Sequence, residues 1–158
     1  MRNKIMTDGG GALVETALSM SLLVALMFGA VEFGRLAFAA IEVNNAAKAA
    51  AQYGAQNRVT SADLAGMLNA AQNEYFNPST LHLISPTASS GYTCDCADAA
   101  NGTTVACSNS IASPACPGSY MEVTITVQTQ ASFDPLIHVP GIPGPFTLTG
   151  VAKQKVLQ

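Results

Sequence analysis

Residues 9–35 of the chain read GGGALVETALSMSLLVALMFGAVEFGR, and this stretch decides the fold. Residues 16–31 carry no charge, and counting from Ala12 gives about 20 mostly apolar residues, which match a bilayer core of roughly 30 Å. Glu15 is the only charge in this span. A charge at membrane depth is expensive and usually serves a function. We therefore predict a transmembrane helix over about 12–31 in which Glu15 has a functional role.

The first ten residues, MRNKIMTDGG, are polar, carry Arg2 and Lys4, and end in glycine. A secretory signal peptide has its cleavage site after the apolar core, whereas this glycine-rich junction precedes it. Cleavage at the junction leaves the hydrophobic segment on the mature protein, which resembles the class III signal of type IV pilins. The positive-inside rule places the N-terminus in the cytoplasm and the rest of the chain across the membrane. An ordinary signal anchor or an uncleaved signal peptide is the alternative.

The helix is predicted to continue beyond the membrane to about Gln56. Glu32 and Arg35 stand three residues apart, a spacing that lets them pair on one helix face. The following segment, LAFAAIEVNNAAKAAAQYGAQ, is rich in alanine, the best helix former, and contains no proline. We expect its stripe of small apolar side chains to pack on the protein's own sheet rather than on another subunit. The stripe consists of Leu36, Ala40, Val43, Ala47, Ala50 and Gly54.

A second helix is predicted in the segment SADLAGMLNAAQNEYF, residues 61–76, with Thr60 or Ser61 as its N-cap. The proline at 78 ends it. A short strand is expected from Leu81 to about Thr87.

Two longer strands are predicted near the C-terminus. YMEVTITVQT, residues 120–129, alternates apolar and polar side chains, which is typical of a half-buried strand. FTLTGVAKQKV, residues 146–156, alternates again, and the segment between them is too rich in proline and glycine for regular structure. The predicted fold class is α+β, with the long N-terminal helix of residues 11–57 packed on a small antiparallel sheet. Residues 58–158 form the exported globular part.

The four cysteines lie in a cysteine-rich insertion at residues 91–119 and are Cys94, Cys96, Cys107 and Cys116. Exported domains favour disulfides, and four cysteines allow three pairings. Asn101-Gly102 is a strong two-residue turn signal, and a hairpin that turns there places Cys96 opposite Cys107. We therefore predict the disulfides Cys96–Cys107 and Cys94–Cys116. A zinc site is the alternative, although a CxC pair with long gaps fits common zinc spacings poorly.

Composition and motifs argue against an enzyme and against nucleic acid as a partner. The 158 residues carry a net charge of -3 and no basic patch. The chain has no Gly-x-Ser-x-Gly, phosphate loop or His-Glu-x-x-His. His82 and His138 lack a carboxylate or cysteine at a telling spacing, and Asp95 and Asp98 suit a solvated loop better than a cation site. We expect no catalytic residues, no metal and no cofactor.

Four features together resemble one family. They are the Gly10–Gly11 junction with Glu15 at the fifth mature position, Glu32-Phe33-Gly34-Arg35 at the membrane exit, the stretch Asn45–Tyr53, and two C-terminal strands around a proline-rich turn. The chain is similar in these features to the TadE-like minor pilins (pseudopilins) of type IVc tight-adherence pilus systems. The resemblance covers most of residues 9–57 and 120–157, and Thr16 departs from it where these families often carry an aromatic residue.

The resemblance implies a route and a function. A prepilin peptidase would cut on the cytoplasmic face, after Gly10, so that residues 1–10 are a leader and Gly11 is the first mature residue. The run of three glycines also permits a cut after Gly11. The helix would hold the protein in the inner membrane as a single pass, with the C-terminal part periplasmic or extracellular. The protein would then meet other pilin subunits and the assembly machinery, and assemble or prime a pilus for surface attachment.

By the same resemblance, Glu15 is both part of the processing signal and the residue that pairs with the free amine of a neighbouring subunit. The alternative function is a signal-anchored exported binding domain that presents the disulfide loop to a ligand and does not polymerise. Glu15→Leu separates the two, because a plain anchor gains from losing a membrane charge whereas a pilin loses assembly.

Overall fold

The computed structural model describes residues 9–84, 92–97, 104–107, 115–136 and 144–156. Its elements in chain order are α1 (Gly9–Gly54), η1 (Thr60–Ala62), α2 (Leu64–Asn73), η2 (Pro78–Thr80), β1 (Leu81–Ile84), β2 (Tyr92–Cys96), β3 (Thr104–Val105), β4 (Met121–Phe133) and β5 (Phe146–Lys155). This is an α+β fold with a long N-terminal helix and an antiparallel sheet, which confirms the predicted class. The chain divides into two compact units, residues 1–37 and 38–158, and α1 contributes to both.

Helix α1 begins at Gly9 and ends at Gly54, close to the predicted bounds of about 12 and 56. An alanine-rich segment without proline explains why the helix is uninterrupted. In the second unit one face of α1 is buried, and the predicted stripe lies on that face. Of its members, Val43, Ala47, Ala50 and Gly54 are buried and Ala40 is half-buried.

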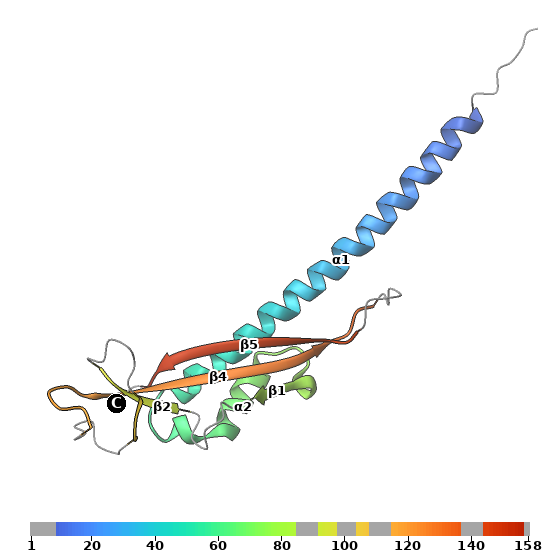
Figure 1. Ribbon diagram of the computed structural model, residues 1–158. Helices are drawn as coiled ribbons and strands as arrows, with labels where there is room; N and C mark the ends of the chain where they lie inside the picture. The colour runs from blue at the N-terminus through green and yellow to red at the C-terminus, as the bar shows by residue number, and fades with distance from the viewer. Residues whose placement is uncertain (1–8, 85–91, 98–103, 108–114, 137–143, 157–158) are drawn as a thin grey trace, which may run out of the picture. The chain divides into compact units, whose positions relative to one another are not determined.

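The sheet is built around β4, which pairs along both edges (Figure 1). Strand β5 lies along one edge of β4, from Thr124 opposite Lys155 to Phe133 opposite Phe146. On the other edge β2 pairs with residues 121–125 and β1 pairs with residues 128–131, and the two-residue strand β3 adds outside β2. Strand β4 runs four residues beyond the predicted end at Thr129, because both β1 and β5 supply partners for its continuation.

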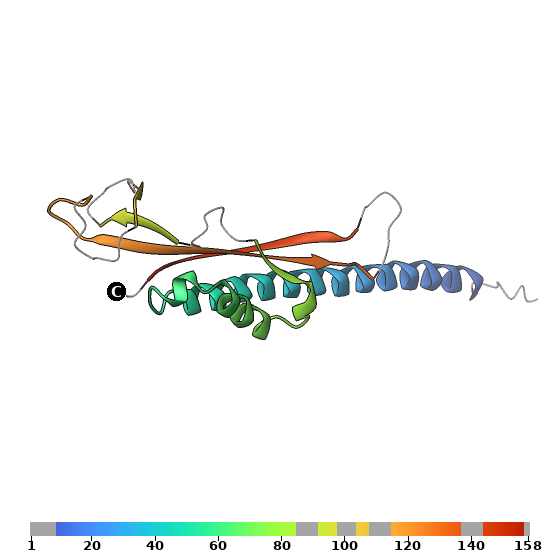
Figure 2. The same cartoon turned by 90° about the horizontal axis from the view of Figure 1, so that it is seen from below.

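The alternation along β4 separates a buried face from a polar face. Met121, Val123, Ile125 and Val127 are buried, and they share one core cluster with Met67 of α2. Figure 2 shows α2 beside the C-terminal part of α1, on the same face of the sheet. Burial of these aliphatic side chains contributes roughly 25 cal/mol per Å² of apolar surface and is the main stabilising term of this unit.

Helix α1 approaches the sheet closely at the backbone carbonyl of Val43. The hydroxyl of Thr129 donates a buried hydrogen bond of 2.8 Å to this carbonyl. Gly150 is the register partner of Thr129, and a Cβ at position 150 would lie 2.5 Å from the same oxygen. Glycine is therefore required there, because the helix backbone occupies the space of a side chain. This contact confirms that the stripe of α1 packs on the protein's own sheet.

Helix α2 begins later than predicted, and its N-cap is Asp63 rather than Thr60 or Ser61, which lie in η1. One oxygen of Asp63 accepts a hydrogen bond of 2.9 Å from the Gly66 amide, and the other accepts one of 2.8 Å from the Tyr53 hydroxyl. The hydrogen bond from the Gly66 amide is the largest cause of a lowered pKa of Asp63, and the hydrogen bond from the Tyr53 hydroxyl is the second. The cap therefore joins the start of α2 to the last turns of α1.

Candidate functional site

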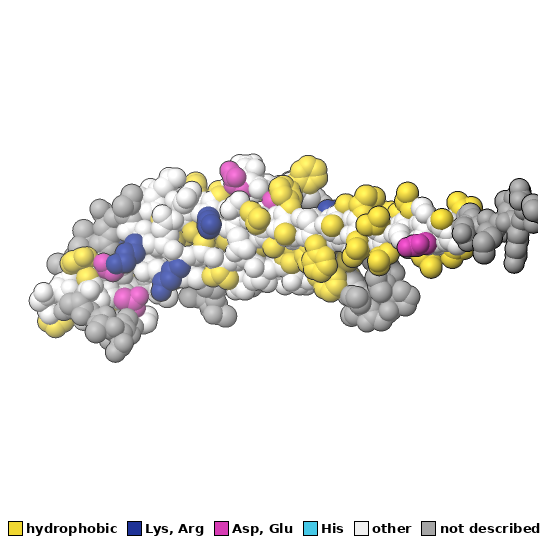
Figure 3. Space-filling view, turned by 90° about the horizontal axis from the view of Figure 1, so that it is seen from above, with side chains coloured by type: hydrophobic (Ala, Val, Ile, Leu, Met, Phe, Trp, Pro, Cys, Tyr) yellow, Lys and Arg dark blue, Asp and Glu magenta, His cyan; other side chains and the backbone are white. Residues whose placement is uncertain are grey.

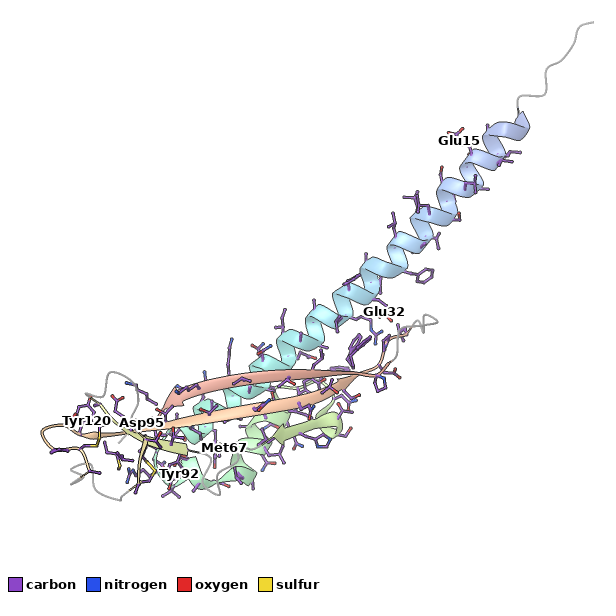
Figure 4. The ribbon with its side chains drawn as sticks, viewed as in Figure 1. Glu15, Glu32, Met67, Tyr92, Asp95 and Tyr120 are labelled. Atoms are coloured by element: carbon purple, nitrogen blue, oxygen red, sulfur yellow. A yellow bond between two sulfur atoms is a disulfide. The ribbon has the colours of Figure 1, made fainter. Side chains whose placement is uncertain are left out.

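Glu15 lies in the second turn of α1, on an exposed part of the helix, and its side chain points away from the helix axis (Figure 4). Neighbouring polar groups bond to their own helix: Thr16 Oγ1 donates to the Ala12 carbonyl and Ser21 Oγ to the Leu18 carbonyl, both at 2.8 Å. Within residues 9–84 and the other described segments, no hydrogen bond or ion pair reaches the Glu15 carboxylate. The Glu15 carboxylate therefore projects from an exposed part of the helix and makes none of these contacts within the described residues.

The surroundings of Glu15 are apolar. Leu13, Val14 and Leu18 are exposed by 73%, 61% and 67%, and Figure 3 shows many hydrophobic side chains on the face of the N-terminal part of α1 that it draws. Among the described residues α1 is the one helix long and apolar enough to cross a membrane, and its most apolar stretch is not buried by the rest of the chain. This segment could therefore be a membrane anchor.

The two junction glycines are exposed at the start of α1. A Cβ added at Gly10 or at Gly11 would meet nothing within 4 Å, so the described fold does not require glycine at either position. This differs from Gly150, where the fold demands it. The basic residues Arg2 and Lys4 of the predicted leader lie outside the described residues.

Glu32 and Arg35 form the ion pair that their spacing predicts. Arg35 Nη1 lies 2.8 Å from Glu32 Oε2, three residues away on the same helix. Pairing neutralises both charges locally, which lowers their cost beside an apolar helical segment. The pair marks the end of the uncharged stretch that begins after Glu15.

The predicted disulfide pairing is wrong. The structure joins Cys94 to Cys107, with Cα atoms 5.3 Å apart, and Cys96 to Cys116, with Cα atoms 5.5 Å apart. The prediction relied on a hairpin register fixed by Asn101-Gly102, which lies outside the described residues. In the observed register Cys94 lies opposite Val105. Cys107 follows Val105 by two residues and therefore lies near Cys94, whereas the prediction placed it opposite Cys96.

The second disulfide follows from the pairing of β2 with β4. Cys96 is the last residue of β2 and lies opposite Met121, and the Ala97 amide donates to the Tyr120 carbonyl at 3.0 Å. The turn that carries Cys116 immediately precedes Tyr120, so Cys116 is brought beside Cys96. With all four cysteines in disulfides, the zinc alternative lacks its thiolate ligands.

Of the remaining candidate residues, His82 and Asp95 are described, and neither belongs to a metal-binding cluster of described residues. His82 lies exposed on β1 and Asp95 is half-buried on β2, whereas His138 and Asp98 lie outside the described residues. Over the described part of the chain, no cluster of three His, Cys, Asp or Glu side chains could hold a metal ion. Sequence reasoning missed Gly150 and Thr129, which fix α1 to the sheet. A glycine inside an alternating strand pattern was the available signal for this close backbone approach.

Comparison with known proteins identifies the N-terminal segment. The model of the family described as TadE-like protein matches residues 10–52. This range starts at the glycine junction and includes Glu15 and the Glu32–Arg35 pair. No curated protein and no solved structure matches the chain. Residues 10–52 are thus similar to the TadE-like family, and this similarity is consistent with a protein of a tight-adherence pilus system.

Proposed function

We propose that this protein is a minor pilin (pseudopilin) that a prepilin peptidase processes and that takes part in assembling or priming a tight-adherence pilus for surface attachment. The observation that carries the proposal is Glu15, an exposed carboxylate without a partner in the described chain, inside an apolar helix that matches the TadE-like family. An anchor that only holds a domain in the membrane has no use for this charge.

The processing step uses the glycine junction. Residues 1–10 are the leader, and the cut falls after Gly10 on the cytoplasmic face, where Arg2 and Lys4 hold the N-terminus. Gly10 and Gly11 have open space around them, which supports a role in recognition by a second protein rather than in packing. Cleavage leaves Gly11 with a free amine, four residues before Glu15.

The assembly step uses the charge that this cleavage creates. In an apolar helix bundle the Glu15 carboxylate of one subunit attracts the N-terminal ammonium of its neighbour strongly, because the local dielectric constant is low. An unpaired charge at that depth costs several kcal/mol. The pair therefore favours addition of a processed subunit and disfavours a subunit that retains its leader.

The proposed membrane topology is set by the apolar segment of α1. Residues 12–31 span the inner membrane, and residues 58–158 lie in the periplasm or outside the cell. The disulfides Cys94–Cys107 and Cys96–Cys116 suit that oxidising side of the membrane. The insertion at residues 91–119 is then a stapled surface of the exported part.

The test is Glu15→Leu, with Val14→Leu as the matched control at the neighbouring exposed position. Each variant replaces the native protein in cells, and the protein is measured in membranes and in sheared pili. We expect Glu15→Leu to remain in membranes and to be lost from the pilus fraction, or to abolish pili, whereas Val14→Leu behaves as the native chain. Normal piliation with Glu15→Leu would favour the plain signal-anchored binding domain.

A further inference from the structure

One end of the unit formed by residues 38–158 carries exposed apolar side chains. We call this set the apolar end; its members are Phe38 and Ile41 of α1, Leu136 after β4, and Phe146 of β5. Their side chains are exposed by 60%, 58%, 70% and 37%. A patch of large exposed apolar side chains often marks a surface that binds a membrane or another protein.

The contacts of α1 place these residues at the same end of the unit. The Val43 carbonyl faces Gly150, and Gly54 faces Ile125, whose register partner is Gln154. Strand β5 therefore runs in the same direction as α1, as Figures 1 and 2 also show. Phe146 precedes Gly150 by about 13 Å of strand.

Phe38 precedes Val43 by only about 7.5 Å of helix. Because Gly150 faces Val43 and β5 runs parallel to α1, Phe146 lies at least as far as Phe38 toward the apolar end of the unit. Leu136 follows Phe133, the register partner of Phe146, and belongs to the same end.

In the proposed topology a short linker joins Phe38, a member of the apolar end, to the membrane span. Only residues 32–37 separate the proposed span from Phe38, and six residues reach no more than about 21 Å in any conformation. As helix they cover about 9 Å, comparable to the headgroup layer on one side of a bilayer. This limit holds for Phe38 in every orientation of the unit formed by residues 38–158.

The charged residues of β5 lie far from the apolar end. The strand is uncharged from Phe146 to Ala152, and its two cations, Lys153 and Lys155, lie at the opposite end. Asp134 is the one charge among described residues 131–149, so anionic headgroups gain nothing here. The chemistry fits the acyl–headgroup boundary of a bilayer, with burial of apolar area as the driving force.

We propose that the apolar end rests on the outer surface of the inner membrane and inserts Leu136 and Phe146 at the lipid interface. The inference rests on the proposed function insofar as that function makes α1 a membrane anchor. Lipid contact would hold the exported unit against the bilayer until assembly withdraws the subunit from the membrane.

The test uses the absence of tryptophan from the chain. Three full-length variants each carry one tryptophan: Leu136→Trp at the apolar end, Val59→Trp as a control beyond the C-terminal end of α1, and Leu22→Trp in the span. Val59 is exposed by 80%, so it matches Leu136 in character but not in position. Each variant is reconstituted at low density in phosphatidylcholine vesicles, with and without brominated acyl chains.

We expect bromine to reduce the fluorescence of Leu136→Trp to about half, in low and in high salt alike, as apolar insertion requires. Leu22→Trp should also be quenched, and Val59→Trp should not. Quenching of Leu22→Trp without quenching of Leu136→Trp would overturn the lipid contact and leave the anchor intact. An unquenched Leu22→Trp would instead overturn the anchor, and with it the proposed function.

A third outcome also contradicts the inference. If the emission of Leu136→Trp shifts to the blue only as protein density rises, and bromine has no effect, a second copy of the chain covers the apolar end.

Discussion

The two parts of helix α1 share one secondary structure but meet different surroundings. Up to Ala37, side chains such as Leu22 and Leu26 are exposed by more than half. From Val43 onward, one face disappears under the sheet and α2. The comparison shows that helix formation is a local property of these residues, whereas burial depends on what lies beside them. The first part is mostly apolar and exposed, so it could be a membrane anchor.

Replacing leucine by alanine should have the largest effect on the free energy of unfolding in the core of the second unit, and no effect in the first part of α1. Leu81→Ala empties a core position that is 2% exposed, and it should lower the free energy of unfolding by about 3 kcal/mol. Leu22→Ala should leave that free energy unchanged, because the Leu22 side chain is exposed by 63%. Pulse proteolysis in urea on the detergent-solubilised chain measures both. Equal losses would mean that the two parts of α1 fold as one cooperative unit.

Gly150→Ala should break the docking of α1 on the sheet. The new Cβ meets the Val43 carbonyl, which is backbone and cannot rotate away, so we expect a loss of about 2 kcal/mol. Gly34→Ala is the matched control, because a Cβ at Gly34 meets nothing within 4 Å. Unfolding followed by circular dichroism gives both values, and an unchanged Gly150→Ala would contradict the close approach of helix and strand.

Thr129→Val tests the hydrogen bond at the same point while keeping the shape of the side chain. Loss of the buried bond to the Val43 carbonyl should cost about 1 kcal/mol. Thr126→Val, on the other face of β4, should cost less. If the two variants have the same urea midpoint, the hydroxyl of Thr129 contributes nothing to docking.

The smallest effect concerns the link between the end of α1 and α2. The pKa of Asp63 is lowered, chiefly by the Gly66 amide and then by the Tyr53 hydroxyl, so the folded state favours the carboxylate. Its contribution to stability is complete above the unfolded pKa, near 4, and is lost as pH falls through the lower folded pKa.

Asp63→Asn should therefore reduce the unfolding midpoint at neutral pH and flatten its fall at acid pH. Glu74→Gln removes an exposed carboxylate just beyond the other end of α2 and is the matched control for the loss of one acidic side chain. If the unfolding midpoint of Asp63→Asn falls with decreasing pH in the same way as that of the native protein, Asp63 is not the cause of the acid dependence.

Local patterns made most of the fold predictable. The apolar and alanine-rich sequence defined α1 to within three residues at each end, and alternation defined β4 and β5, because both signals lie within the element itself. The N-cap of α2 was misplaced for a non-local reason: Asp63 is selected partly by Tyr53, ten residues earlier. The extension of β4 likewise depends on strands that pair with it from elsewhere in the chain.

The cysteine pairing could not be read from a turn signal. The register of β2 is set by its five pairs with β4, from Tyr92 opposite Ile125 to Cys96 opposite Met121. These partners are about 25 to 35 residues away, and no short motif encodes that register. Glu15, by contrast, was found from sequence because its signal is purely local: one charge in an apolar helix.

In the proposed function, the glycine junction before the apolar part of α1 is a prepilin cleavage site. The most direct test is the N-terminal sequence of the membrane-extracted protein, expressed with and without a prepilin peptidase, alongside Gly10→Ala and a Gly9→Ala control. We predict a start at Gly11 that requires the peptidase, is lost in Gly10→Ala and survives in Gly9→Ala. An intact Met1 in the presence of the peptidase, or a cut beyond residue 30, would contradict the account.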